Sequence, residues 1–205
     1  MGTQAKYLII GSGVAGFHAL KELLNETGES IAMITDDRDY PYDRPPLSKQ
    51  YLAGSMDREK VFFESSGFYN RPNLSIILGR SVVKIRASEG SVELSDGSTV
   101  GFEKALVATG GRPRRIEAPG ALYLRTLRDA DAIREAAARS RAVLIVGGGF
   151  IGVEAAASMR MRGLEATIIE ARPHIMSMFM GDEVAIFMEK YLSRHGINIV
   201  TGDTL

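Results

Sequence analysis

Two glycine-rich segments of this chain have a spacing that suits phosphate binding. The first, Gly11–Gly16, follows a short apolar run and precedes a segment with helical periodicity. In the pattern G-x-G-x-x-G the first glycine permits a tight turn and the second lets the backbone approach a pyrophosphate. The third lets the helix pack closely on the strand, and the helix N-terminus supplies free N–H groups. The residues expected to line this loop are Gly11, Gly13, Val14, Ala15 and Gly16.

An acidic residue is expected about 20 positions after such a loop, where its carboxylate holds the ribose hydroxyls of a nucleotide. Asp36 and Asp37 both lie at about this distance from Gly16. The spacing does not choose between them, so either carboxylate can hold the ribose.

The second segment, Gly147–Gly152, has the same pattern and the same context. Glu170 ends the strand predicted after it, where a carboxylate binds a ribose 2′-hydroxyl and repels a 2′-phosphate. This favours NADH over NADPH. Arg172 argues weakly the other way, because arginine pairs with phosphate, but Glu170 has more weight because it lies at the strand end. The residues expected at this loop are Gly147, Gly149, Phe150, Ile151 and Gly152.

One such pattern alone also occurs as a tight strand-to-helix turn that binds no ligand. Here it occurs twice, each time with a buried strand before it, a helix after it and an acidic residue at the expected distance. The repetition favours two dinucleotide sites over two ligand-free turns.

The elements around the loops follow from the hydrophobic pattern. Short apolar runs predict strands buried on both faces of a parallel sheet, and apolar residues at helical spacing predict the helices between them. The alternation over residues 81–107, with turn signals at Glu89-Gly90 and Asp96-Gly97, is typical of an antiparallel meander. The predicted strands are 6–10, 30–34, 74–78, 104–110, 142–146, 166–170 and one from 198; the predicted helices are 14–25, 128–140, 150–162 and 182–195.

The fold class expected is therefore α/β, with two Rossmann-like dinucleotide-binding folds in series. The first carries the antiparallel meander as an insertion, and the second is truncated at Leu205. Residues 111–127, rich in proline, glycine and arginine, are interpreted as the connection. The predicted domains are residues 1–110 and 111–205.

Composition excludes several classes of site. Basic and acidic residues both number 25, so the basic surplus of a nucleic-acid binder is missing. The absence of cysteine excludes disulfides, cysteine-based metal sites and a redox dithiol. His18, His174 and His195 have no metal-ligand spacing, so no metal site is expected, and the methionines at 176, 178 and 180 are interpreted as a soft apolar patch. No signal peptide or membrane-spanning segment is found, so a cytoplasmic protein without a membrane partner is expected.

The segment Pro41-Tyr-Asp-Arg-Pro-Pro-Leu-Ser-Lys49, together with both glycine loops and Ala108-Thr-Gly110, closely resembles the FAD-dependent ferredoxin and rubredoxin reductases of bacterial oxygenase systems. The resemblance extends from the first strand to the last residue. It implies that the first loop, with Asp36 or Asp37, holds the ADP half of FAD and that NADH reduces the flavin. A ferredoxin or rubredoxin would then accept single electrons. It also implies further FAD contacts, from Arg44 and Lys49 near the pyrophosphate and the flavin ring, Val82 at the adenine, and Ala108, Thr109, Gly110 and Arg112 beneath the flavin.

The resemblance also implies two catalytic residues, Lys49 and Glu154. A cation beside the flavin stabilises the anion that forms when the ring accepts hydride, and Glu154 resembles a glutamate that approaches this lysine. Taken without the resemblance, these residues would be read as unrelated surface charges. Related enzymes that use a redox cysteine are excluded, because the chain has none.

Two alternatives remain open. Monodehydroascorbate reductases and apoptosis-inducing-factor-like NADH reductases have a similar loop and differ mainly in electron acceptor. A non-catalytic, truncated dinucleotide-binding module is the other alternative. Because the family continues beyond the point matched by Leu205, the 205-residue form is expected to hold FAD weakly or not at all and to form a homo-oligomer.

Overall fold

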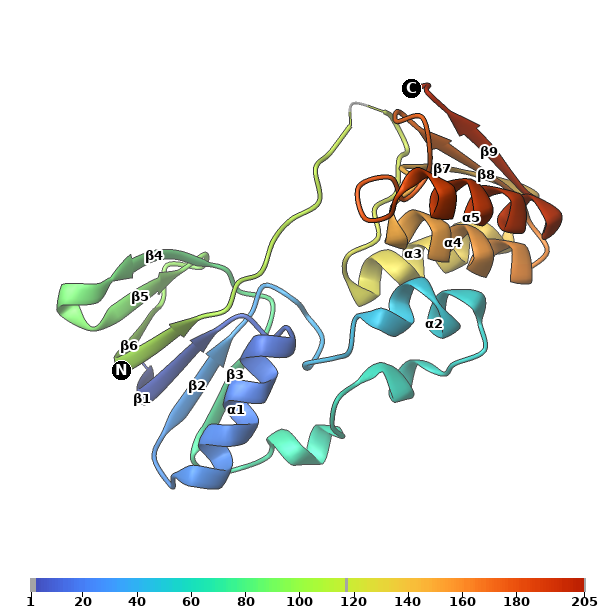
Figure 1. Ribbon diagram of the computed structural model, residues 1–205. Coiled ribbons are helices and arrows are strands. Elements are labelled where there is room, and N and C mark those ends of the chain that lie inside the picture. The colour runs from blue at the N-terminus through green and yellow to red at the C-terminus, as the bar shows by residue number, and fades with distance from the viewer. Residues whose placement is uncertain (1–2, 117, 205) are drawn as a thin grey trace. The chain divides into compact units, whose positions relative to one another are not determined.

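The computed structural model describes residues 3–116 and 118–204 (Figure 1). The chain divides into two compact units. Unit 1 comprises Met1–Asp43 and Phe62–Arg112, and unit 2 comprises Arg44–Val61 and Pro113–Leu205. Each unit is built on its own sheet. The division after Arg112 falls inside the connection predicted from the sequence. No helix of the described part is long and apolar enough to cross a membrane.

Unit 1 contains a six-stranded sheet in the order β3-β2-β1-β6-β5-β4. The first four of these strands run parallel, and β4 and β5 extend the sheet as an antiparallel meander, as predicted. Helix α1 connects β1 to β2 and completes the first βαβ unit. The elements are β1 (Thr3–Ile10), α1 (Val14–Glu26), β2 (Ile31–Ile34), η3 (Ser66–Tyr69), β3 (Leu74–Ile77), β4 (Val82–Arg86), η4 (Ala87–Glu89), β5 (Ser91–Leu94) and β6 (Thr99–Val107).

Strand β6 is one continuous element, whereas the sequence suggested a meander strand followed by a separate strand over 104–110. Residues 99–101 pair antiparallel with β5, and from Val100 onward the same strand pairs in parallel with β1. Because Val100 and Gly101 take part in both pairings, the strand continues without interruption from one pairing to the other. The alternating and the buried apolar patterns belong to one strand with different neighbours.

The core of unit 1 lies on both faces of the sheet. Phe17 and Leu20 of α1 pack on one face against Ile9 and Met33. The side chains that alternate with these, among them Leu8, pack on the other face against the apolar residues of β5 and β6. Burial on both faces explains why β1 and β2 are almost uninterrupted apolar runs.

Unit 2 contains a three-stranded parallel sheet in the order β7-β8-β9, with α4 packed on β7 and β8 and α5 packed on β9. The second predicted βαβ unit is therefore confirmed. Its core joins Ala156 and Leu192 of the helices to Ala166 and Ile168 of β8. The elements are α3 (Leu127–Ala138), β7 (Ala142–Val146), α4 (Phe150–Met161), β8 (Glu165–Glu170), α5 (Asp182–Arg194) and β9 (Ile197–Thr201).

Residues 44–61 pack with unit 2, although the division at 110 placed them in the first domain. They form η1 (Pro45–Ser48), α2 (Gln50–Ala53) and η2 (Arg58–Val61), a stretch in which the sequence predicted no helix or strand. Leu52 is fully buried among Ala137, Met159 and Leu164. The hydroxyl of Tyr51 donates to the carboxylate of Asp131, and burial and this bond raise the Tyr51 pKa. Apolar burial and this hydrogen bond attach the segment to unit 2.

Candidate functional site

The first glycine loop makes a turn that only glycine can occupy at two positions. Gly11 has a φ of +109°, and its N–H donates to the carbonyl oxygen of Ile34 at 2.8 Å. A Cβ atom on Gly11 would lie 2.3 Å from the carbonyl oxygen of Ala108, and one on Gly16 would lie 1.9 Å from that of Gly11. These contacts bring the end of β1, the start of α1 and the end of β6 together.

The second glycine loop repeats this geometry in unit 2. Gly147 has a φ of +101°, and its N–H donates to the carbonyl oxygen of Ile169 at 2.8 Å. A Cβ atom on Gly152 would lie 1.9 Å from the carbonyl oxygen of Gly147. The two patterns found in the sequence therefore fold in the same way, each with its third glycine against the first.

The helices that follow the two loops begin without a cap. Helix α1 starts after Gly13 and α4 after Gly149; neither has a capping side chain or an acidic residue in its first turn. The first intrahelical hydrogen bonds are donated by the N–H groups of Phe17 and Val153. The N–H groups of the three residues before each of these have no carbonyl partner within the helix. These N–H groups belong to Val14, Ala15, Gly16, Phe150, Ile151 and Gly152.

The other two long helices of the described chain satisfy their N-termini differently. Thr126 and Asp129 form a capping box at α3, and α5 carries Asp182 and Glu183 in its first turn. The N–H groups and the positive ends of α1 and α4 are thus left for an external anion. The donors and the close backbone approach fit the pyrophosphate of a dinucleotide.

The structure separates the two acidic candidates after β2. The Asp37 carboxylate accepts a hydrogen bond from the Tyr42 hydroxyl at 2.5 Å and one from the Asp39 N–H at 3.3 Å. Asp36 is exposed, and among the described residues its carboxylate has no hydrogen-bond partner. Asp37 therefore holds its own loop together, and Asp36 is free to bind a ligand.

Glu170 joins the end of β8 to the second glycine loop. One carboxylate oxygen accepts from the Gly148 N–H at 2.7 Å, and the other accepts from the Arg172 N–H at 2.9 Å. Each oxygen keeps a lone pair that can accept from a ribose hydroxyl. The side chain of Arg172 lies at the exposed surface, so its part in this arrangement comes from the backbone.

The methionine-rich segment after β8 contacts the same loop, a role that the sequence interpretation missed. The N–H of Met176 donates to the Gly148 carbonyl oxygen at 2.8 Å, and Ile175 is buried where a Cβ on Gly148 would meet it at 2.6 Å. The ring of Phe179 lies 4.8 Å from that of Phe150, and both are exposed. Apolar patterning alone did not reveal these contacts, because they depend on a loop that folds back.

Lys49 and Glu154, far apart in sequence, form an ion pair within unit 2. The Lys49 Nζ lies 2.9 Å from the Glu154 Oε2, and the Ser48 hydroxyl donates to the same oxygen at 2.6 Å. Glu154 lies in α4, two residues after Gly152 of the second glycine loop. Partial burial raises the pKa of Glu154, but the hydrogen bonds from Ser48 and Lys49 outweigh it and hold the pKa below its usual value.

The remaining predicted residues are distributed over both units. Val82 begins β4, and its side chain packs on the core of unit 1. Thr109, Gly110 and Arg112 follow β6 and are exposed; Gly110 has a φ of +67°. Arg44 begins the segment that packs with unit 2, and its carbonyl oxygen accepts from the N–H of Leu47 at 2.9 Å.

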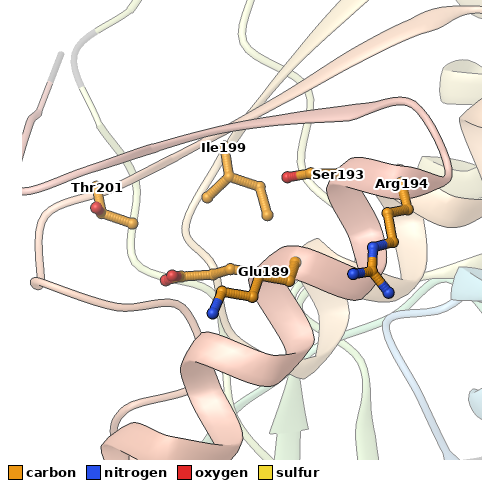
Figure 2. A pocket seen from close by; sticks show the side chains of 6 residues that line it. Glu189, Ser193, Arg194, Ile199 and Thr201 are labelled. Atoms are coloured by element: carbon orange, nitrogen blue, oxygen red, sulfur yellow. The ribbon is translucent and has the colours of Figure 1, made fainter.

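A depression between α5 and β9 is the pocket shown in Figure 2. It contains none of the residues predicted from the sequence to bind a cofactor. Charged ends of α5 side chains border it, and it offers no loop of free N–H groups. Its lining residues are Glu189, Lys190, Ser193, Arg194, Ile199 and Thr201.

Comparison with known proteins agrees with this geometry. Residues 5–205 match the family model described as pyridine nucleotide-disulphide oxidoreductase. Rhodocoxin reductase of Rhodococcus erythropolis is 32% identical over 198 residues, which cover 94% of this chain and 46% of the relative. The ferredoxin–NAD(+) reductase subunit of the benzene 1,2-dioxygenase system of Pseudomonas putida is 33% identical over 197 residues, covering 93% and 48%.

Solved structures show the same similarity. Putidaredoxin reductase in its covalent complex with putidaredoxin superposes with a TM-score of 0.91 at 29% identity, covering 100% of this chain and 51% of that one. The NADH:rubredoxin oxidoreductase of Clostridium acetobutylicum also gives 0.91, at 26% identity, with coverages of 98% and 54%. The chain thus spans about half the length of the relatives it matches.

Proposed function

Because the chain belongs to the pyridine nucleotide-disulphide oxidoreductase family, we propose that it is part of an FAD-dependent NADH:ferredoxin or NADH:rubredoxin reductase. Hydride passes from NADH to FAD, and single electrons then pass to an iron–sulfur protein. The observation that carries the proposal is the repeated glycine loop with an uncapped helix, once in each unit. The names of two relatives, the ferredoxin–NAD(+) reductase subunit of a benzene 1,2-dioxygenase system and an NADH:rubredoxin oxidoreductase, support the choice of acceptor.

In this proposal unit 1 binds the ADP half of FAD. The N–H groups of Val14, Ala15 and Gly16 hold the pyrophosphate, and the free carboxylate of Asp36 accepts from the ribose hydroxyls. Val82 supplies backbone groups to adenine. Residues 108–110 and Arg112 of the same unit serve the flavin half.

The second glycine loop and Glu170 then bind NADH in unit 2. A carboxylate already held by two backbone N–H groups is fixed in position, so it accepts from a 2′-hydroxyl and repels a 2′-phosphate. This arrangement supports a preference for NADH over NADPH. The Phe150 ring, in contact with Phe179, lies at the exposed start of α4, where it shields a bound nucleotide from water.

FAD, when bound, supplies the two-electron acceptor that releases electrons one at a time. The chain's own contribution is electrostatic. The Lys49 ammonium is a positive charge that favours a developing anion nearby, and the ion pair with Glu154 orients this ammonium. The chain has no cysteine, so it supplies no dithiol.

The acceptor assignment is tested at an FAD concentration that titration shows to saturate the protein, because weak FAD binding is expected of the 205-residue form. NADH-dependent reduction of a ferredoxin, a rubredoxin and monodehydroascorbate is compared under the same conditions, with NADPH as the alternative reductant. We expect faster reduction of an iron–sulfur protein than of monodehydroascorbate. Reduction of monodehydroascorbate alone would overturn the acceptor, and the absence of NADH oxidation with every acceptor would support a non-catalytic module.

A further inference from the structure

The backbone that carries Lys49 is hydrogen-bonded to the helix that carries Glu154. The hydroxyl of Ser158 lies 2.7 Å from the carbonyl oxygen of Ser48 and 3.2 Å from that of Lys49. Ser158 is 3% exposed and follows Glu154 by one turn of α4, so both project from the same face of the helix. One buried hydroxyl therefore contacts two successive carbonyl groups.

The rest of the Lys49 backbone is bonded as well. Its N–H donates to the carbonyl oxygen of Pro46 at 3.0 Å. Its carbonyl oxygen accepts from the N–H of Ala53, the last residue of α2, at 2.8 Å. The preceding side chain, Ser48, donates to the same Glu154 oxygen that Lys49 contacts. Residues 48–49 are thus attached to α4 at two points, one through Glu154 and one through Ser158.

Two physical reasons indicate that the hydrogen bonds of the Ser158 hydroxyl hold the Ser48–Lys49 backbone in place. A buried hydroxyl costs free energy unless it is hydrogen-bonded, and alanine would be the better helix former at this position. An exposed ion pair, in turn, has little intrinsic preference for one geometry, because two long side chains lose entropy when they are held together. The Lys49 side chain is 43% exposed, so its position on Glu154 depends on a fixed backbone.

We propose that Ser158 is a positioning residue, whose hydroxyl fixes the Ser48–Lys49 backbone against α4 and thereby holds the Lys49 ammonium on Glu154. The catalytic consequence rests on the function proposed for Lys49. The positioning itself is a property of unit 2 and can be measured without any cofactor.

The test follows the Glu154 carboxyl group by NMR titration in the 205-residue chain, for the parent, Ser158→Ala and Ser158→Thr. Ser140→Ala is the matched control, because the Ser140 hydroxyl also donates to a backbone carbonyl of unit 2, that of Ala136, but at an exposed helix end. We expect Ser158→Ala to raise the Glu154 pKa toward that of an ordinary glutamate, because Ser48 and Lys49 no longer stay on its oxygen. Ser158→Thr, which keeps a hydroxyl at this position, should retain the parent pKa of Glu154, and Ser140→Ala should leave this pKa unchanged.

A second readout uses the protein saturated with FAD. Ser158→Ala should lower the maximal rate of flavin reduction by NADH roughly tenfold while the NADH concentration at half-maximal rate stays constant, because a misplaced group loses transition-state stabilisation. An unchanged Glu154 pKa in Ser158→Ala overturns the positioning role. A raised pKa with an unchanged flavin reduction rate supports that role and instead contradicts the catalytic assignment of Lys49.

Discussion

Replacing Gly16 by alanine is expected to damage the first glycine loop, although alanine is the better helix former. The added Cβ would lie 1.9 Å from the carbonyl oxygen of Gly11, whereas ordinary contact begins at 3.4 Å, so the two must separate by about 1.5 Å. Gly11 has little room to move away, because the Ala108 carbonyl oxygen is packed close against it, 2.3 Å from the point where a Cβ added to Gly11 would lie. The turn that approaches the pyrophosphate must therefore open.

The magnitude follows from two opposing effects. Alanine in place of glycine stabilises a helix by about 1 kcal/mol. Overpacking of a rigid contact costs about 1–3 kcal/mol, and here the obstructing atoms are backbone atoms. Because rigid backbone atoms place the cost at the upper end of this range, we expect Gly16→Ala to lower the free energy of unfolding by up to about 2 kcal/mol. It should also weaken FAD binding at least about tenfold, because a shifted loop loses its hydrogen bonds to phosphate.

Urea denaturation and FAD titration measure both effects. Gly28→Ala is the matched control, because no atom lies within 4 Å of the Cβ it would add. Gly152→Ala places the same 1.9 Å clash in unit 2 and should weaken NADH binding instead. A Gly16→Ala protein that unfolds like the parent and binds FAD as tightly would refute the reasoning.

Four further substitutions separate the remaining assignments. Asp36→Asn should weaken FAD binding without changing stability, whereas Asp37→Asn should lower the free energy of unfolding by about 1 kcal/mol; equal effects on FAD titration would contradict the distinction. Lys49→Met should slow flavin reduction about 10²-fold, measured by stopped flow. Because the pKa of Glu154 is lowered in the folded state, its stabilising contribution is present near neutral pH and is lost as the pH falls below 4.5 through the lowered pKa. The stability difference between parent and Lys49→Met should therefore close at acid pH, and a constant difference would argue against the ion pair. Glu170→Ala should narrow the rate advantage of NADH over NADPH, and equal use of both by the parent would contradict that role.

The sequence predicted those parts of the fold that depend on local patterns. The glycine loops, their strands and their helices follow from spacing and periodicity, and the observed bounds lie close to those predicted. The choice between Asp36 and Asp37 could not be predicted, because it depends on where the Tyr42 hydroxyl lies after folding. Spacing likewise could not show that Ser158 contacts residues far earlier in the chain.

The packing of residues 44–61 with unit 2 has the same kind of cause. The segment contains prolines and charges that indicate a loop, and only its contacts with α3 and α4 explain its short helix. Tyr51 and Leu52 are apolar enough to be buried by either unit, so their sequence alone does not assign them. Long-range contacts decide the boundary of a unit that is not continuous in sequence.

Anaerobic stopped-flow measurement of flavin absorbance tests the central claim most directly. The protein saturated with FAD is mixed with increasing NADH, and free FAD mixed with NADH provides the reference rate. The proposal predicts loss of the oxidised flavin absorbance at a rate that saturates with NADH and far exceeds the reference. A rate equal to that of free FAD at every NADH concentration would contradict it.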